Sequence, residues 1–456
     1  MRRAVALACV AALSACSLAP KDVDPGTPVP PAFPQGGAYP ALDAGTPTYV
    51  WRDAFADPRL QAAIAQALAS NQDLAQALAN VEAARARYRQ QRAEQLPQLN
   101  ASAGYERSGG SGADNDRFSL GAQVPAFELD LFGRVASLSA AARERWLAST
   151  ENARAVRLTL IAEVARAWLA HGRDASLLAV ARDTAASAGE AVRINRLRLE
   201  GGIAPRSDLR QAEIVLRTAE ADVASLTTAV EQDRNALRLL LGAEPDPAGL
   251  PVSIADADAR IAQVPAGLDS QVLLRRPDVS AAERELRAAN AEIGAARAAL
   301  FPRISLTGLL GFASNALGGL FSGGAFAWSA GADASYSIFA GGAARAGVQL
   351  SEAQRAAALA AYRKAIQEAF RDVADALARA GTIDAELRVV EAGDTAAADN
   401  LRLATMRYRG GVESYLGELT ARQARYSAAR NLVQTRFERA SNRVDLYAAL
   451  GADGSL

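Results

Sequence analysis

The absence of proline from two long stretches restricts the fold of this chain more than any other sequence feature. No proline occurs between Pro125 and Pro205, and none follows Pro302. Alanine, leucine, arginine and glutamate, which are strong helix formers, fill both stretches. We therefore expect one long helix at about 135–200 and another at about 343–409. Each would be about 100 Å long at a rise of about 1.5 Å per residue.

Glycine pairs mark the ends of both predicted long helices. Glycine readily adopts the left-handed conformation that closes a helix C-terminus, so two consecutive glycines are a strong stop signal. A second helical pattern follows each pair, at about 205–241 in the first half of the chain and at about 412–450 in the second. Each half is therefore expected to contain a helical hairpin. The predicted hairpin tips are the glycine pairs Gly201 and Gly202, and Gly410 and Gly411.

The two halves of the chain resemble each other, which predicts a tandem duplication. The first structural repeat would span 51–250 and the second 251–456. Leu96-Pro97 in the first corresponds to Phe301-Pro302 in the second, and the glycine pairs follow in the same order. Solenoid repeats are only about 20–50 residues long, so the repeated unit here is a whole half of the protein.

The pattern changes from helical to alternating after Pro97 and after Pro302. Proline pushes the residue before it out of the helical region, so both prolines are expected to mark helix–strand junctions. Segments near ten residues suit tilted transmembrane β-strands, although Pro125 interrupts the alternation in the first half. A pair of ordinary β-hairpins on a soluble helical protein is the alternative. The predicted strands lie at about 98–107, 117–131, 303–312 and 326–339.

Four strands are too few to close a membrane barrel, because the smallest such barrels have about eight. Open sheet edges are not tolerated in lipid, so a chain that inserts these strands must share its barrel with other copies. After the first twenty or so residues, no apolar run approaches the length of a membrane-spanning helix. The expected fold class is therefore mainly α, with long antiparallel helical hairpins and a membrane β-barrel portion.

The N-terminus carries the pattern of an exported lipoprotein. A basic start and an apolar stretch predict a signal peptide at 1–15, and the small residues before Cys16 resemble the bacterial lipobox. Cys16 would be lipidated, and Ser17 after it lacks the aspartate of an inner-membrane retention signal, so the outer membrane is the expected destination. An ordinary cleavage site that leaves a free thiol is the alternative. Residues 16–50 are rich in proline and predict an extended tether without a core.

Composition excludes several function classes. The chain has 50 Lys and Arg residues and 50 Asp and Glu residues. It therefore lacks the excess of basic residues that is typical of a nucleic-acid-binding protein. It contains no Walker A motif, no metal-spaced set of His and Cys, and no nucleophile motif. We therefore expect no enzyme activity and no cofactor. His171, the only histidine, is expected to pack on the helix stripe rather than bind a ligand.

Several motifs together resemble one known family. The run from Leu273 to Asp278 (LLRRPD), the run from Glu128 to Arg134 (ELDLFGR) and Phe301-Pro302 are similar to segments of TolC/OprM-type outer-membrane efflux proteins, in their NodT-like lipoprotein branch. The resemblance covers roughly residues 50–451. It implies a homotrimer, in which four strands per chain form a twelve-stranded barrel and the long helices form a tunnel. It also implies two partners, a periplasmic adaptor and an inner-membrane transporter of the resistance-nodulation-division (RND) class, and the export of small molecules such as drugs.

The resemblance also implies a gate at the periplasmic end, near the glycine pairs. The family often has an acidic residue at the position of Thr420 and an arginine at that of Gln423, so this chain departs from the family's acidic ring. Candidate gate residues carried over by position, or lying close to those positions, are Tyr408, Arg409, Glu413, Leu416, Glu418 and Thr420, with Asp208 from the first tip.

Two other functions remain open from the sequence. One is an outer-membrane duct for protein or polysaccharide secretion, built on the same fold. The other is a lipid-tethered periplasmic scaffold without transport. The duplicated strand hairpins and the complete motif set weigh against the scaffold. The lipobox-like segment and the Arg-Arg-Pro-Asp run favour efflux over secretion, by resemblance alone.

Overall fold

The computed structural model describes residues 18–21, 26, 28–40, 50–109, 115–261 and 270–451. Cys16 and the predicted signal peptide at 1–15 lie outside the described residues. The chain divides into two compact units, each of which takes segments from both predicted repeats. The strand unit comprises Met1–Gly26, Leu78–Glu151 and Ser280–Lys364. The hairpin unit comprises Thr27–Ala77, Asn152–Val279 and Ala365–Leu456.

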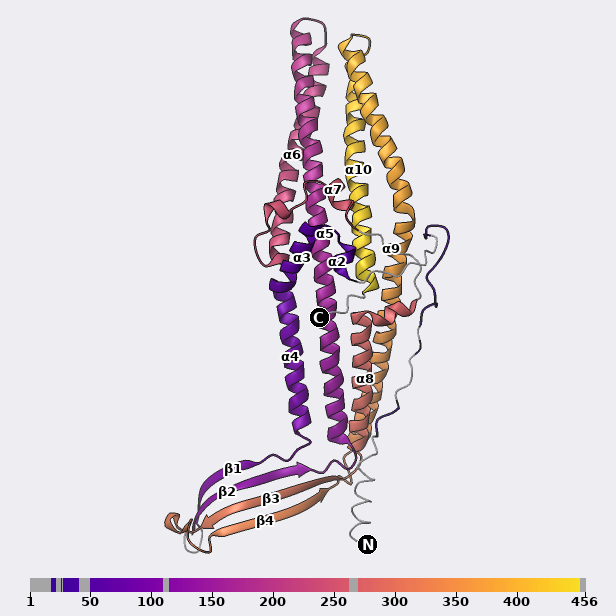
Figure 1. Cartoon of the computed structure of the whole chain (residues 1–456). Helices are drawn as coiled ribbons and strands as arrows, with labels where there is room; N and C mark the ends of the chain where they lie inside the picture. The colour runs from indigo at the N-terminus through magenta and orange to yellow at the C-terminus, as the bar shows by residue number, and fades with distance from the viewer. Residues whose placement is uncertain are drawn as a thin grey trace. The chain divides into compact units, whose positions relative to one another are not determined.

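The described chain is mainly helical, with four strands (Figure 1). The helices are α2 (Trp51–Ala54), α3 (Pro58–Ser70), α4 (Gln72–Ala93), α5 (Arg134–Glu200), α6 (Arg206–Leu241), α7 (Ile254–Asp258), α8 (Pro277–Ala298), α9 (Ala343–Arg409) and α10 (Tyr415–Leu450). The strands are β1 (Asn100–Ser108), β2 (Asn115–Glu128), β3 (Arg303–Ser314) and β4 (Phe326–Ser335). Three short 3-10 helices are η1 (Pro247–Gly249), η2 (Ser270–Arg275) and η3 (Leu317–Gly319).

Corresponding helices of the two predicted repeats have equal lengths. The long helices α5 and α9 each have 67 residues, and their return helices α6 and α10 each have 36. The helices that precede the first strand of each repeat, α4 and α8, each have 22. Pro97 lies between α4 and β1, and Pro302 directly precedes β3. Equal lengths in the same order are what a duplication of one half would produce.

The four strands form one antiparallel sheet in the order β1-β2-β3-β4. Pro125 lies inside β2, so the interruption expected from the sequence does not end the strand. The register of β2 against β3 instead shifts between Val124 and Phe127. A β-bulge of this kind accommodates a residue that cannot donate a ladder hydrogen bond. Two strands end earlier than the predicted 131 and 339, since β2 stops at Glu128 and β4 at Ser335.

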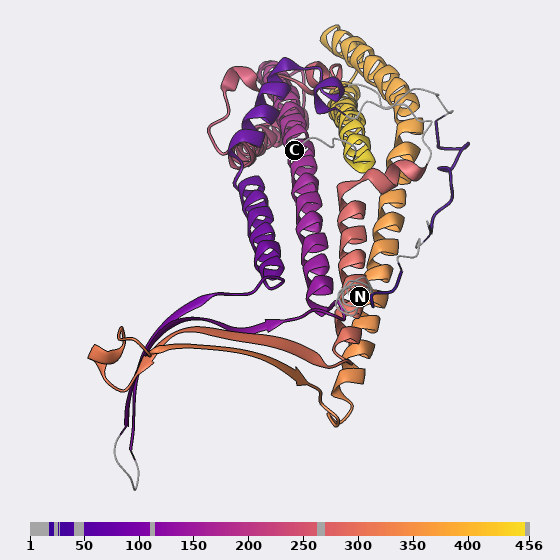
Figure 2. The ribbon, with the colours of Figure 1, turned by 60° about the horizontal axis from the view of Figure 1, so that its bottom comes forward.

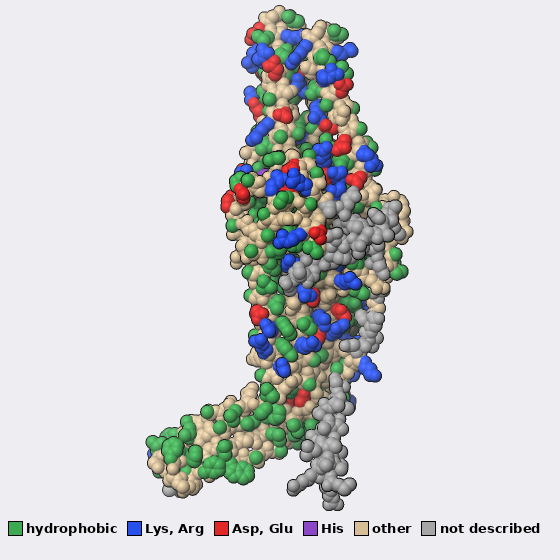
Figure 3. Space-filling view, in the orientation of Figure 1, with side chains coloured by type: hydrophobic (Ala, Val, Ile, Leu, Met, Phe, Trp, Pro, Cys, Tyr) green, Lys and Arg blue, Asp and Glu red, His purple; other side chains and the backbone are tan. Residues whose placement is uncertain are grey.

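The sheet has one apolar face and, apart from Leu309, one face of small and polar residues. Leu310 pairs with Trp328 and Phe312 pairs with Phe326, and all four side chains are exposed. On the view of Figure 3, hydrophobic side chains gather over the sheet, while most charged side chains lie over the helices. The outer edges of β1 and β4, on opposite sides of the sheet in Figure 2, pair with no other described strand. Within the described residues, no helix has the length and apolarity required to span a bilayer.

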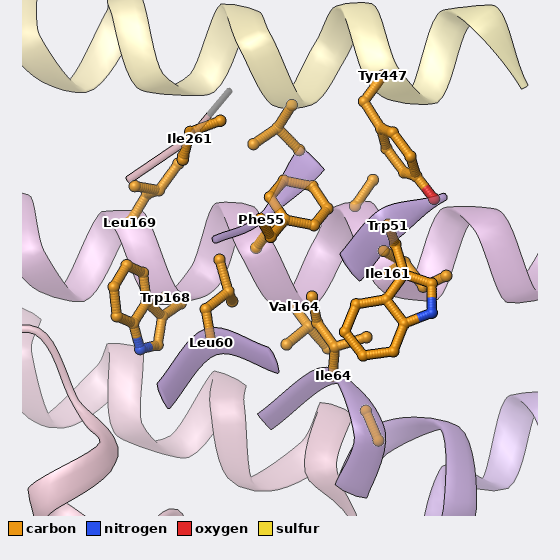
Figure 4. Close-up of a cluster of buried hydrophobic side chains, with 14 of the residues drawn as sticks. Trp51, Phe55, Leu60, Ile64, Ile161, Val164, Trp168, Leu169, Ile261 and Tyr447 are labelled. Carbon is orange, nitrogen blue, oxygen red and sulfur yellow. The ribbon is translucent and has the colours of Figure 1, made fainter. Parts of the chain in front are cut away.

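The core of the hairpin unit fixes α5 against its neighbours (Figure 4). Trp168 on α5 is fully buried and donates a hydrogen bond of 2.9 Å from Nε1 to the carbonyl of Gly249. Phe55 after α2 is also fully buried and meets the ring of Tyr447 on α10 edge to face, with centroids 5.2 Å apart. His171 is buried, as its place on the helix stripe predicted, and burial lowers the pKa of its imidazole.

Part of the expected tether packs against the hairpin unit. We call residues 28–40 the N-terminal strap. Phe33 of the strap is buried and stacks on Phe370 of α9, with ring centroids 4.9 Å apart. A Cβ atom at Gly381 of α9 would lie 2.1 Å from the carbonyl oxygen of Ala38, so only glycine permits this approach. The prediction that residues 16–50 make no core is therefore wrong for this portion, because the aromatic ring of Phe33 finds an apolar partner.

A cluster of charged groups lies between α5, α6 and α10. The Asp174 carboxylate is buried and accepts hydrogen bonds from Arg173 at 2.6 and 3.0 Å. The same guanidinium lies 4.7 Å from the centre of the Phe437 ring on α10. On α6, burial and then the neighbouring Asp174 charge raise the pKa of Asp233 to about 7. Asp233 therefore changes its charge near neutral pH.

Candidate gate at the tips of the helical hairpins

Both hairpin tips have the same hydrogen-bonded structure. After α5, the amide of Gly202 donates to the carbonyl of Leu199 at 3.0 Å, and Ile203 donates to Arg198 at 2.8 Å. After α9, Gly411 donates to Tyr408 at 3.1 Å, and Val412 donates to Arg407 at 2.9 Å. Gly202 and Gly411 have φ angles of 70° and 74°, the left-handed conformation that this Schellman closure requires. The second glycine of each pair therefore turns the chain.

Tyr408 joins the two hairpins. Its side chain is buried, and its hydroxyl donates a hydrogen bond of 2.7 Å to Oδ1 of Asn195 on α5. The guanidinium of Arg198 lies 4.3 Å from the centre of the Tyr408 ring and donates to the Tyr408 carbonyl at 3.3 Å. Asn195 is only 1 % exposed, and its Nδ2 donates to the carbonyl of Ala191 at 2.9 Å. Both polar ends of the amide are therefore satisfied between α5 and α9.

Tyr415 lies beside Tyr408 but differs in its polar environment. The two ring centroids are 5.4 Å apart, and Tyr415 is 2 % exposed. Its hydroxyl has no hydrogen-bond partner among the described residues. Burial raises the pKa of Tyr415 to about 12. The ring therefore contributes apolar packing, within a cluster that includes Ala191, Val192, Leu209 and Ala212.

Glu418 is buried inside the subunit. It is 3 % exposed, and its Oε1 accepts from Arg422 at 2.5 Å and from the hydroxyl of Thr405 at 3.2 Å. Arg422, also buried, donates in addition to the hydroxyl of Ser187 on α5. The structure thus places Glu418 in a network that links α10 to α9 and α5. Its carboxylate does not lie on the surface of the chain, where a pore-lining charge would have to be.

The remaining predicted gate residues lie at or near the surface. Arg409, Leu416 and Thr420 are exposed, and Leu416 keeps 61 % of its accessible area. The Thr420 hydroxyl donates to the carbonyl of Leu416 at 2.9 Å. Glu413 is half-buried and accepts from Arg407 at 2.9 Å, and Asp208 is half-buried. The predicted set therefore divides into a buried pair, Tyr408 and Glu418, and five more accessible residues.

Sequence reasoning missed the partners of the buried pair. Asn195 is a weak helix former placed inside a helix of 67 residues, and this local conflict was the available signal. Arg422 lies one turn after Glu418, which is the spacing of a helical ion pair. Within the described part of the chain, no group of three His, Cys, Asp or Glu side chains could hold a metal ion.

Paired long helical hairpins, combined with an open four-stranded sheet that has one apolar face, define the class of outer-membrane channel subunits. A family model described as outer membrane efflux protein matches residues 63–243 and 268–452. The chain belongs to the outer membrane efflux protein family, and its place is the outer membrane. This membership confirms the efflux protein family, the fold class and the outer-membrane location expected from the sequence, while the NodT-like lipoprotein branch stays a prediction.

Two relatives illustrate the similarity. The outer membrane protein OprJ of Pseudomonas aeruginosa is 38 % identical over 447 residues, covering 96 % of this chain and 93 % of its own length. The toluene efflux pump outer membrane protein TtgI of Pseudomonas putida is 38 % identical over 460 residues, covering 97 % of each.

Solved structures agree with these matches. A membrane protein from Pseudomonas aeruginosa matches with a TM-score of 0.89 and 38 % identity, over 96 % of this chain and all of that one. The open state of the Neisseria gonorrhoeae MtrE outer membrane channel matches with a TM-score of 0.85 and 37 % identity, over 96 % of this chain and 98 % of that one.

Proposed function

We propose that three copies of this chain form the outer-membrane channel of a tripartite efflux pump. The channel would receive small molecules from an inner-membrane RND transporter, to which a periplasmic adaptor joins it. The chain would perform no catalysis and need no cofactor, since the partner transporter would supply the energy. Relatives named for the efflux of toluene, solvents and antibiotics support small, largely apolar cargo.

The open sheet is the observation that carries this proposal. One face of the sheet is apolar, while the outer edges of β1 and β4 pair with no described strand. Unpaired backbone groups cost several kcal/mol each in a bilayer, so such a sheet is stable in lipid only when other copies close it. Three copies would supply twelve strands, and their long hairpins would continue the channel as a helical tunnel.

We propose that the hairpin tips close this tunnel at its periplasmic end. The exposed side chains of Arg409, Leu416 and Thr420 would line the constriction, with Glu413 and Asp208 beside it. Tyr408 and Glu418 would act behind them, by holding α9 and α10 against α5. Opening would then require the separation of α9 from α5, and contact with the adaptor would supply the force.

The lipid anchor belongs to the same proposal. Cys16 would carry a fatty acid in the outer-membrane lipid, as expected of the lipoprotein branch. Cells labelled with a fatty-acid analogue should show labelled wild-type protein and unlabelled Cys16→Ser protein. Labelling of the Cys16→Ser variant would remove Cys16 as the attachment site and leave the channel proposal intact.

Two measurements in the host cell test the transport proposal. One is photocrosslinking from the hairpin tips, and the other is resistance to toxic small molecules. Photoreactive groups at Ile203 and Val412, which are 76 % and 72 % exposed, should capture a periplasmic adaptor. Deletion of the chain should lower resistance to small apolar toxicants, and the wild-type protein should restore it. Capture of an ATP-driven protein or polysaccharide exporter would support the secretion duct instead. Capture of cell-wall proteins alone, with unchanged resistance, would support the scaffold.

A further inference from the structure

Residues that closely follow the expected lipid attachment site lie along α8, within the strand unit. Asn290 of α8 is buried, and its Nδ2 donates a hydrogen bond of 2.9 Å to the carbonyl of Pro20. One turn further along α8, a Cβ atom at Gly294 would lie 2.9 Å from the amide nitrogen of Ala19. A real Cβ atom does not approach a backbone so closely, so only glycine permits this contact.

The contacts give this N-terminal segment a direction. Nη1 of Arg297, near the C-terminal end of α8, lies 3.5 Å from the carbonyl oxygen of Leu18. Residues 20, 19 and 18 therefore meet successive turns of α8, which ends at Ala298. Two residues of extended chain reach about 7 Å, so Cys16 is tied to within that distance of Leu18. We call Asn290, Gly294 and Arg297 the α8 track.

A cavity with a largely apolar lining lies where α8 passes into β3, in the same unit. We call it the junction cavity. Its volume is about 510 Å³, and its lining begins at Ala298 and includes residues from the turns after β2 and β4. Leu300 and Phe301 line the cavity and remain partly exposed, and Ile338 and Phe339 after β4 are 93 % and 89 % exposed. Cavities of about 300–1,000 Å³ accommodate apolar molecules of moderate size.

The acidic groups of the junction cavity already have partners. The Glu128 carboxylate accepts hydrogen bonds of 2.8 and 2.6 Å from Arg134. The Asp130 carboxylate accepts one of 2.7 Å from the amide of Ala136, in the first turn of α5. What the cavity still offers to a ligand is therefore mainly apolar surface.

We infer that the α8 track holds the mature N-terminus so that an acyl chain on Cys16 enters the junction cavity. This inference rests on the proposed lipid anchor and specifies where that anchor lies. Leu18 is held by Arg297, one residue before the cavity lining begins. The remaining reach of about 7 Å brings Cys16 to the junction of helix and sheet. The acyl chain is the apolar group that the protein itself would carry to this place.

The α8 track contacts backbone groups of the N-terminal segment. Asn290 and Arg297 approach the carbonyls of Pro20 and Leu18, and Gly294 leaves room for the backbone of Ala19. Position along the helix is therefore fixed by the main chain. An anchor held in this way would fasten the lipid to one point of the strand unit.

A photoreactive fatty acid tests where the acyl chain lies. Cells that express the full chain would be grown with a fatty acid that carries a diazirine, irradiated, and their membranes digested with trypsin. The wild type should give a crosslink from peptide 16–21 to peptide 298–303, or to peptide 304–345, which contains Ile338 and Phe339. The Cys16→Ser protein should lose both crosslinks.

Two matched glycine variants test the α8 track. Gly294→Val would place side-chain atoms on Ala19 and should lower the yield of the crosslink several-fold. Gly347→Val, on α9 in the same unit, meets nothing within 4 Å of its Cβ atom and should keep the wild-type yield. Asn290→Ala removes only the bond to Pro20 and should lower the yield by a smaller factor. Native mass spectrometry would show that each variant assembles as the wild type does.

The outcomes separate this inference from the anchor on which it rests. A labelled wild-type protein whose acyl chain crosslinks only to phospholipid would overturn the junction cavity and leave the lipid anchor intact. A wild-type protein without any label would overturn the anchor and this inference with it. Equal yields from Gly294→Val and Gly347→Val would remove the α8 track.

A free phospholipid is the competing occupant, because the exposed Arg345 also lines the junction cavity and suits a phosphate group. A phospholipid adduct on peptide 298–303 that is equally abundant in the wild-type and Cys16→Ser proteins would assign the cavity to phospholipid. That result would overturn the inference.

Discussion

The hydroxyl of Tyr408 and the side-chain oxygen of Asn195, 213 positions apart in the sequence, are joined by a hydrogen bond of 2.7 Å between α9 and α5. Both residues are buried, and Arg198 covers the Tyr408 ring. The bond therefore connects the second hairpin to the first close to the point where both helices turn back. The proposed opening, which separates α9 from α5, would have to break this bond.

Tyr408→Phe should favour the open state of the channel. The variant leaves Oδ1 of Asn195 buried without a donor, which costs about 1–3 kcal/mol in the closed arrangement. Single-channel recordings in planar bilayers should show a higher open probability than the wild type. Tyr415→Phe is the matched control, since its hydroxyl has no partner among the described residues and its loss should leave the recordings unchanged. Equal behaviour of both variants would remove the Tyr408–Asn195 bond from the gate.

Glu418→Ala should destabilise the hairpin tip by about 3–5 kcal/mol, because it leaves the Arg422 guanidinium buried without its counter-ion. The expected result is faster amide hydrogen exchange in α9 and α10 near the tip, measured by mass spectrometry. The double variant Glu418→Leu with Arg422→Leu removes both charges and should recover most of the protection. Arg409→Ala, at an exposed position, should leave the exchange rates unchanged. Normal protection in Glu418→Ala would show that the ion pair does not hold the tip.

The loss of the proton from Asp233 should make the hairpin unit less stable as the pH rises. The pKa of Asp233 is about 7 in the folded chain against an ordinary value of 3.8, so the folded state binds the extra proton between these values. Stability therefore falls as the pH rises through this window and is lowest above it. Asp233→Asn should raise the unfolding temperature at about pH 8 and change it little at about pH 4. Glu231→Gln on the exposed surface should show no such difference, and an equal gain for Asp233→Asn at both pH values would contradict the assignment.

Gly381→Val should displace the N-terminal strap from α9. The new Cβ would overlap the carbonyl of Ala38, whereas nothing lies within 4 Å of a Cβ at Gly393 on the same helix. Gly393→Val therefore matches the change in helix propensity without the clash. Amide hydrogen exchange of the N-terminal strap, measured by mass spectrometry, should be faster in the Gly381→Val protein. The same rate in both variants would mean that the strap is not held at Gly381.

Local signals explain how much of the fold could be predicted from the sequence. The glycine pairs and prolines act on the backbone within one or two residues, so helix ends and the helix–strand boundaries near Pro97 and Pro302 follow from them directly. Pro125 shows the limit of the same reasoning. A bulge between Val124 and Phe127 accommodates this proline within β2. The bulge depends on how β3 pairs with β2, which the sequence near Pro125 does not specify.

The interior of the candidate gate could not be predicted in this way. Resemblance selected Glu418 as a charge near the tip, but its burial depends on Ser187 and Thr405 from two other helices. The pairing of Tyr408 with Asn195 likewise depends on how two helices from different repeats pack. Such contacts depend on how the helices pack in three dimensions. The spacing of residues along one helix does not predict that packing.

The equal length of α5 and α9 sets a condition on how such a protein can vary. Seven residues inserted into α5 ahead of Asn195 would move that side chain by about 10 Å along the helix axis, and Tyr408 on α9 would lose its partner. The same insertion in both helices would keep the two residues level and lengthen the tunnel. The length of each long helix therefore constrains the length of the other. The distance that the channel extends into the periplasm can change only when both helices gain or lose the same number of residues.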